Sequence, residues 1–169
     1  MSQTGFFISF EGSEGCGKST QIRQLIEDLR RMGQEPVLVR EPGGTPIGEH
    51  IRHLLQHAPE GDTLTPEAEL LLFAAGPRLP DVTFLLDIDP EAGFERLRRR
   101  AQPEAKRDRM EEEPLAFYEA VRQGYLAAAA AEPDRIHVLD ASQPESEVAG
   151  QIRAELQRRS HVFLQGSRV

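Results

Sequence analysis

The sequence has 169 residues, with a single cysteine, no tryptophan and only two tyrosines. One cysteine, Cys16, excludes an intrachain disulfide and any zinc site that needs several cysteines. The longest apolar runs, such as FFISF, are far shorter than the ~18–20 residues that cross a bilayer. The first residues show no charged leader, apolar core and cleavage site, so we expect no export signal and a cytoplasmic location.

Basic residues are also in deficit, with 20 Lys and Arg against 28 Asp and Glu, a net charge of -8. This balance argues against nucleic-acid binding, which usually needs a broad basic face. Hydrophobic residues at 38% and charged residues at 28% are typical of a folded soluble domain. The length suits one domain, which we place at residues 1–160, followed by an aperiodic tail at 161–169.

Short strands alternate with amphipathic helices along the chain. Strands are predicted at 6–11, 35–41, 81–89 and 135–141, where β-branched and aromatic residues run without polar alternation. Helical spacing is found after the glycine loop up to Met32, at 47–58, at 66–75, from Pro90 onwards, at 114–131 and after Gln143. Expected helix caps are Thr65, Asp89 and a Ser142–Glu145 capping box. The alternation predicts an α/β fold with a mainly parallel sheet and helices on both faces, although one strand is missing between the helix at 66–75 and the strand at 81–89.

The strongest motif is the stretch GSEGCGKS, which matches the phosphate-loop pattern G-x-x-x-x-G-K-[ST] and lies between a predicted strand and a predicted helix. In such a loop, backbone N–H groups and the helix N-terminus surround phosphate oxygens. Lys18 is expected to reach the β- and γ-phosphates of a nucleoside triphosphate, and Ser19 to hold Mg²⁺. The predicted loop residues are Gly12, Ser13, Glu14, Gly15, Cys16, Gly17, Lys18 and Ser19, with Cys16 as a small filler.

Two other groups of residues have simpler explanations. His50, His53 and His57 share one face of a predicted helix, opposite its apolar residues, which favours solvent exposure over metal binding. Asp87 and Asp89 end a strand and could hold Mg²⁺, but Asp89 is better explained as a helix cap.

The segment REPGGTPIGE, from Arg40 to Glu49, follows the second predicted strand. Ligands of parallel α/β sheets bind beyond the carboxyl ends of the strands, so Arg40 could face a substrate. An ordinary strand-to-helix loop with Thr45 as cap explains the segment equally well.

The chain resembles the thymidylate kinases in the segments FISFEGSEGCGKST, REPGGTPIGE, AELLLFAA, PDVTFLLDIDPE, DRMEEE and RIHVLDASQPE. The resemblance implies the P-loop nucleoside-monophosphate-kinase fold, a homodimer, and transfer of the ATP γ-phosphate to dTMP. By position it assigns Glu14 to the sugar 3′-hydroxyl and Phe73 to stacking on thymine, with Pro42 nearby. Its helical spacing alone favours a core residue over a substrate-binding one at Phe73.

Seven cations lie between Arg96 and Arg109, in a chain of negative net charge. Such a cluster is often only a solvated helix face, but beside a phosphate loop it favours a lid over the transferring phosphate, near 96–111. The resemblance implies that lid arginines are catalytic when the phosphate loop has none, and we take Arg98, Arg100 and Arg109 as candidates.

The family has a further segment of a few dozen residues after LLFAA, with a strand and more dTMP contacts. Here Ala75 is followed directly by GPRLPD, and that segment is absent. Either the printed sequence omits residues at the Ala75–Gly76 junction, or the segment is deleted. The intact pattern on both sides favours omission. The alternatives to a dTMP kinase are a kinase for another nucleoside monophosphate and a non-catalytic nucleotide-binding module.

Overall fold

The computed structural model describes residues 5–58, 63–65, 68, 79–100 and 114–159. The chain divides into two compact units, one with Met1–Pro36, Pro80–Ala101 and Pro114–Val169, and one with Val37–Leu79 and Gln102–Glu113. Among the described helices, none has the length and apolar character to cross a membrane. The predicted boundary at residue 160 stays a prediction.

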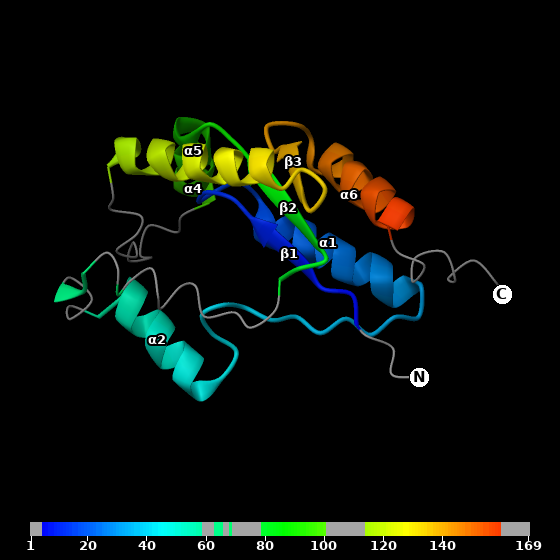
Figure 1. Cartoon of the computed structure of the whole chain (residues 1–169), viewed down its shortest axis with the longest axis horizontal. Helices are drawn as coiled ribbons and strands as arrows, with labels where there is room; N and C mark the ends of the chain where they lie inside the picture. Colours follow the sequence, from blue (N-terminus) through cyan, green and yellow to red (C-terminus); the bar gives the residue numbers. More distant parts are fainter. Residues whose placement is uncertain (1–4, 59–62, 66–67, 69–78, 101–113, 160–169) are drawn as a thin grey trace. The chain divides into compact units, whose positions relative to one another are not determined.

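The first unit contains a parallel sheet in the order β1-β2-β3 (Figure 1). The strands are β1 (Ile8–Glu11), β2 (Val82–Asp87) and β3 (Ile136–Asp140). Ile8 pairs with Val82, and Thr83 pairs with Ile136. Three of the four predicted strands are therefore confirmed, and the carboxyl ends of all three lie at the same edge of the sheet.

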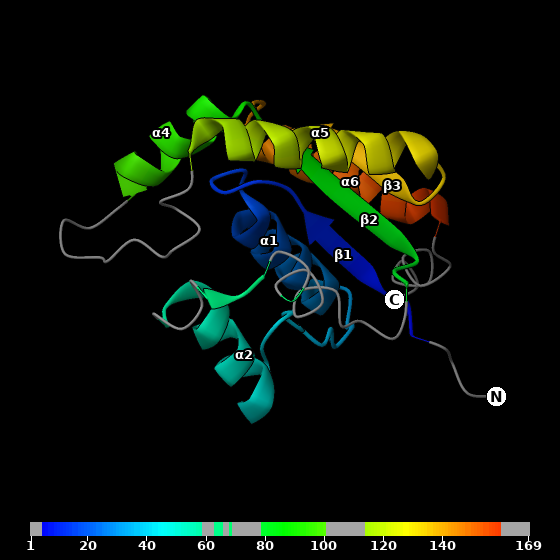
Figure 2. The same cartoon turned by 60° about the vertical axis from the view of Figure 1, so that its left-hand side comes forward.

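Helices cover both faces of this sheet (Figures 1 and 2). On one face, α1 (Lys18–Arg31) packs beside α6 (Glu145–Arg159). On the other lies α5 (Leu115–Ala131), which contacts α4 (Pro90–Arg100). This arrangement confirms the predicted layers of an α/β fold.

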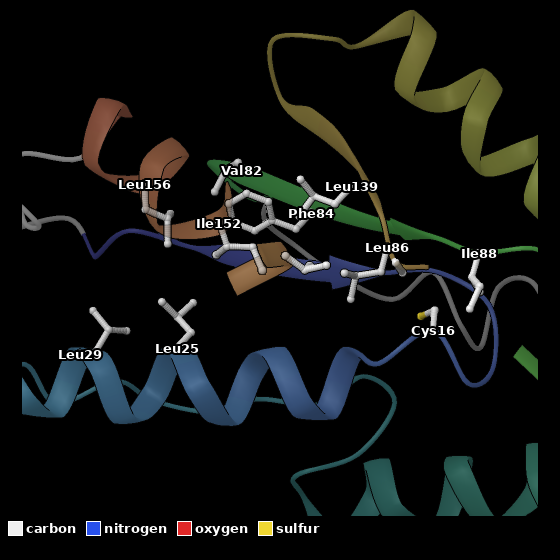
Figure 3. Packing of buried hydrophobic residues seen from close by; sticks show 12 residues of the cluster. Cys16, Leu25, Leu29, Val82, Phe84, Leu86, Ile88, Leu139, Ile152 and Leu156 are labelled. Atoms are coloured by element: carbon white, nitrogen blue, oxygen red, sulfur yellow. The ribbon is translucent and has the colours of Figure 1, made fainter. Parts of the chain in front are cut away.

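The core lies between the sheet and the α1–α6 pair (Figure 3). From β2, the alternate residues Val82, Phe84 and Leu86 are almost completely buried. They meet Leu25 and Leu29 of α1, which are one helical turn apart, and residues of α6. The helical spacing that predicted α1 is therefore the spacing that places Leu25 and Leu29 in the core.

Most of the predicted helix ends are observed. The Asp89 side chain accepts a hydrogen bond from Glu91 N at 3.0 Å, and Thr65 Oγ1 accepts one from Ala68 N at 3.2 Å. Gly33 ends α1 with φ 75°. The rest of the helix predicted at 66–75 lies outside the described residues.

The capping box predicted for α6 is wrong. The helix begins at Glu145, and the Ser142 hydroxyl donates instead to Asp140 Oδ1 at 2.6 Å. Asp140 lies two residues away and accepts from both the Ser142 hydroxyl and its backbone N–H, forming a local turn that competes with a cap.

The second unit contains α2 (Pro46–Gln56), capped by Thr45, whose hydroxyl accepts from Gly48 N at 3.1 Å. His50, His53 and His57 are exposed, as predicted. No group of three or more metal-binding side chains occurs among the described residues. The expected apolar face of α2 is only partly covered, because Leu55 is fully buried but Ile47 is 68% exposed.

The predicted strand at 35–41 is not formed. Val37, Leu38 and Val39 are 86%, 65% and 61% exposed and have no regular secondary structure. Their β-branched composition favours extended backbone, but a strand also needs a neighbour to pair with its N–H and C=O groups. The segment missing at Ala75–Gly76 is the one expected to contain a further strand.

Candidate active site

The phosphate loop follows β1 directly and has three glycines with positive φ: Gly12 at 137°, Gly15 at 72° and Gly17 at 99°. Side-chain-bearing residues rarely adopt such angles. A Cβ on Gly12 would also lie 2.5 Å from the carbonyl oxygen of Leu86. The backbone angles therefore favour glycine at all three positions, and at Gly12 the close approach of β2 requires it as well.

Lys18 is held against the loop. Its Nζ donates to the carbonyl oxygens of Gly12 at 2.7 Å and Ser13 at 3.0 Å. The first turn of α1 begins at this lysine, and no side chain caps it. Its backbone N–H groups and the ammonium group therefore lie together at a helix N-terminus, which is an arrangement that binds phosphate.

Cys16 and Ser19 differ in exposure. Cys16 is 3% exposed and packs in the core, which confirms the prediction of a small filler (Figure 3). Ser19, in the first turn of α1, is exposed, as a metal-binding hydroxyl must be. Two aspartates were candidates for Mg²⁺ binding. Asp89 caps α4, and Asp87 forms a salt bridge with Arg122 of α5.

A cavity of about 390 Å³ lies beside the phosphate loop in the first unit. Its lining includes Gly17 and Gln21 of the loop and α1, Arg96 of α4, and the segment Ala141–Glu145 after β3. Arg96 Nη1 donates to the carbonyl oxygen of Ala141 at 2.8 Å. Arg96, one of the seven clustered cations, thus fixes the segment after β3.

Of the three candidate lid arginines, the structure describes the side chain of Arg98 alone. Arg98 is exposed on α4. The side chain of Arg100, and all of Arg109 and Phe73, lie outside the described residues. Their roles stay predictions.

Arg40 and Pro42, the predicted substrate-binding residues of the second unit, are described. Arg40 Nη2 pairs with Glu49 Oε1 at 2.7 Å, and Gly44 N donates to the same oxygen at 2.8 Å. The Gly44 N–H and then the Arg40 guanidinium lower the pKa of Glu49. Pro42 is buried and follows a cis peptide bond.

An arginine and a tyrosine on α5 have partners that the sequence did not indicate. Arg122 forms a two-point salt bridge to Asp87 at the end of β2, at 2.6 and 2.8 Å, and these hydrogen bonds raise the pKa of Arg122. Three residues later, the Tyr125 hydroxyl donates to Glu11 Oε2 at 3.5 Å, directly before the phosphate loop. Their spacing of i, i+3 placed both on one helix face, but nothing in the sequence identified the opposing carboxylates.

The Tyr125–Glu11 contact predicts a fall in stability at high pH. Burial, and then the negative charge of Glu11, raise the pKa of Tyr125 to about 12 from 10.0. The folded protein therefore keeps the phenol proton where the unfolded chain has lost it, so the free energy of unfolding should fall by about 2 kcal/mol as pH rises from about 10 to about 12.

Urea unfolding of the wild type and Tyr125→Phe, each at about pH 8 and about pH 12, measures this loss. The variant should lose less stability than the wild type between the two pH values. Equal losses would contradict the assignment.

Comparison with known proteins identifies the family. The thymidylate kinase family model matches residues 10–77 and 75–152. The thymidylate kinase of Dinoroseobacter shibae is 38% identical over 207 aligned positions, which cover 92% of this chain and 98% of the relative. That of Deinococcus radiodurans is 35% identical, covering 95% of this chain and 100% of the relative.

The chain belongs to the thymidylate kinase family. The crystal structure of the thymidylate kinase from Ehrlichia chaffeensis matches the fold with a TM-score of 0.62, at 23% identity, over 90% of this chain and 98% of that one. The predicted P-loop kinase fold is confirmed.

The comparisons also confirm that this sequence lacks a segment that its relatives have. The alignment with the Dinoroseobacter shibae enzyme has 207 positions, more than the 169 residues of the whole chain, so a few dozen positions have no counterpart here. The two stretches matched by the family model meet at residues 75–77. This is the junction that the sequence indicated.

Proposed function

We propose that this member of the thymidylate kinase family transfers the γ-phosphate of ATP to dTMP, giving ADP and dTDP. The observation that carries the proposal is the glycine loop, whose three positive-φ glycines lie beside Lys18 at an uncapped helix N-terminus. In the reaction, the bond from the γ-phosphorus to the β–γ bridging oxygen breaks, and a bond from the γ-phosphorus to a dTMP phosphate oxygen forms. The protein's work is to position the groups and neutralise their charge.

The phosphate loop and the cavity beside it would bind the donor nucleotide. The loop N–H groups and Lys18 bind the triphosphate, and Ser19 is the residue that would hold Mg²⁺, which shields the phosphate charge. The cavity between Gln21, Arg96 and the Ala141–Glu145 segment would take the nucleotide base.

The contacts of the acceptor and of the transferring phosphoryl group are proposed from the family resemblance. Glu14, Arg40, Pro42 and Phe73 would contact dTMP, and the lid arginines Arg98, Arg100 and Arg109 would stabilise the transferring group. We also propose that the enzyme is a homodimer, as the family resemblance implies, and that it acts in the cytoplasm.

The proposal is tested with an acceptor panel. Purified protein with ATP and Mg²⁺ should release ADP with dTMP and far less with CMP or dAMP. Turnover of CMP or dAMP without dTMP would indicate another monophosphate kinase. ATP binding without turnover of any acceptor would indicate a nucleotide-binding module.

The intact mass of the same preparation identifies the polypeptide assayed. The printed residues account for 18.9 kDa. A mass several kilodaltons higher means that the segment at Ala75–Gly76 is present. Turnover at 18.9 kDa would show that dTMP is phosphorylated without that segment.

A further inference from the structure

Two glycines far apart in the sequence bring α4 against the phosphate loop. A Cβ on Gly93, in the first turn of α4, would lie 2.6 Å from the carbonyl oxygen of Glu14. A Cβ on Gly15 would lie 2.2 Å from the carbonyl oxygen of Gly93. The backbone of α4 therefore touches the Glu14–Gly15 turn with no side chain between them, and a methyl group on either glycine would force backbone to move.

The cost of Gly93 indicates that this contact matters. A glycine inside a helix destabilises it by about 0.5–1 kcal/mol relative to alanine. Gly124 of α5 carries the same cost, but a Cβ there would meet nothing within 4 Å. Of these two helix glycines, only Gly93 faces the phosphate loop.

A second contact reaches the loop from α5. The Tyr125 hydroxyl donates to Glu11, the residue before Gly12. The helices α4 and α5 are held together by Phe94 and Tyr118, whose rings meet edge to face with centroids 4.7 Å apart. The α4–α5 pair thus contacts the loop both at its start and at its middle.

We infer that Gly93 is a positioning residue for the donor nucleotide, because its bare backbone sets the place of the Glu14–Gly15 turn and so the convergence of the loop N–H groups on the triphosphate. Tyr125 supports the same loop through Glu11. The inference rests on the proposed function in taking ATP as the ligand of the loop. A purely structural Gly93 would affect stability and leave the ATP affinity of the folded protein unchanged.

The test compares Gly93→Ala with the matched variant Gly124→Ala. Both add one methyl group to a helix and raise its helix propensity. Isothermal titration with ATP and Mg²⁺, without acceptor, should show a Kd raised about tenfold or more in Gly93→Ala and changed less than about twofold in Gly124→Ala. A folded Gly93→Ala that binds ATP as tightly as the wild type overturns the inference.

If Gly93→Ala does not fold, the same titration is made with Tyr125→Phe. This variant leaves every backbone contact in place and removes only the hydroxyl at Glu11. Its Kd for ATP should rise about threefold or more, and an unchanged Kd overturns the inference. The titration contains no acceptor, so it does not depend on the identity of the acceptor. A protein that binds ATP but does not phosphorylate dTMP would refute the proposed acceptor, and the titration would still test the role of Gly93. A wild type that does not bind ATP refutes both.

Discussion

Replacing Lys18 with alanine is expected to lower kcat for dTMP phosphorylation by about 10²–10³-fold, since a preorganised cation at the transferring phosphate is worth about 3–4 kcal/mol. In the structure the Lys18 ammonium already lies at the loop, held by the carbonyl oxygens of Gly12 and Ser13. It therefore needs little reorganisation to meet the β- and γ-phosphates. ADP release under saturating ATP and dTMP measures the effect.

The matched control is Arg23→Ala, which removes one cation from an exposed position on the same helix. It should change kcat by less than about twofold, because an exposed charge is screened by water and salt. Equal losses in the two variants would mean that Lys18 acts only through net charge. Full turnover in Lys18→Ala would make the phosphate-loop assignment wrong.

The phosphate loop could be predicted from sequence because its chemistry is local. Glycines at fixed offsets, a lysine and a preceding strand all lie within a dozen residues, so spacing alone defines the geometry. The strands at 8–11, 82–87 and 136–140 were predictable for a related reason. Helices of the same unit cover both faces of the sheet, and the central strand β2 is buried along most of its length, so an apolar composition matches those surroundings.

Features that depend on partners distant in sequence could not be predicted. The segment Val37–Val39 has the composition of a strand but no strand beside it, because pairing depends on a neighbour and not on propensity. Arg122 and Tyr125 looked like ordinary residues of a helix until the fold placed them at Asp87 and Glu11. Gly93 offered one signal, a glycine where a helix prefers alanine, but only the fold shows what it touches.

Phe84→Ala is expected to produce the largest loss of stability, about 3–5 kcal/mol, out of the 5–15 kcal/mol typical of a domain. Phe84 is 0% exposed in the middle of the central strand, and its ring lies 5.5 Å from that of Phe10 on β1. Removing the ring leaves a cavity between the sheet and the helices α1 and α6, which are held in place by further contacts and can refill it only in part. Urea unfolding followed by circular dichroism measures the loss, provided that the slope with urea is unchanged.

Val138→Ala is the control for that loss, since Val138 lies on the neighbouring strand β3 but is 46% exposed. It should cost less than about 1 kcal/mol, because only about half of its surface leaves water on folding and the change removes only two methyl groups. The same core cluster includes Cys16 of the phosphate loop itself and Leu86, whose carbonyl oxygen closely approaches Gly12. Phe84→Ala leaves the contact between Gly93 and the Glu14–Gly15 turn in place, so we expect it to lower ATP binding only by the fraction of protein that is unfolded. Gly93→Ala should lower ATP binding in protein that is folded. An affinity per folded molecule that fell equally in both variants would mean that loop geometry depends on the core as a whole and not on the contact with α4.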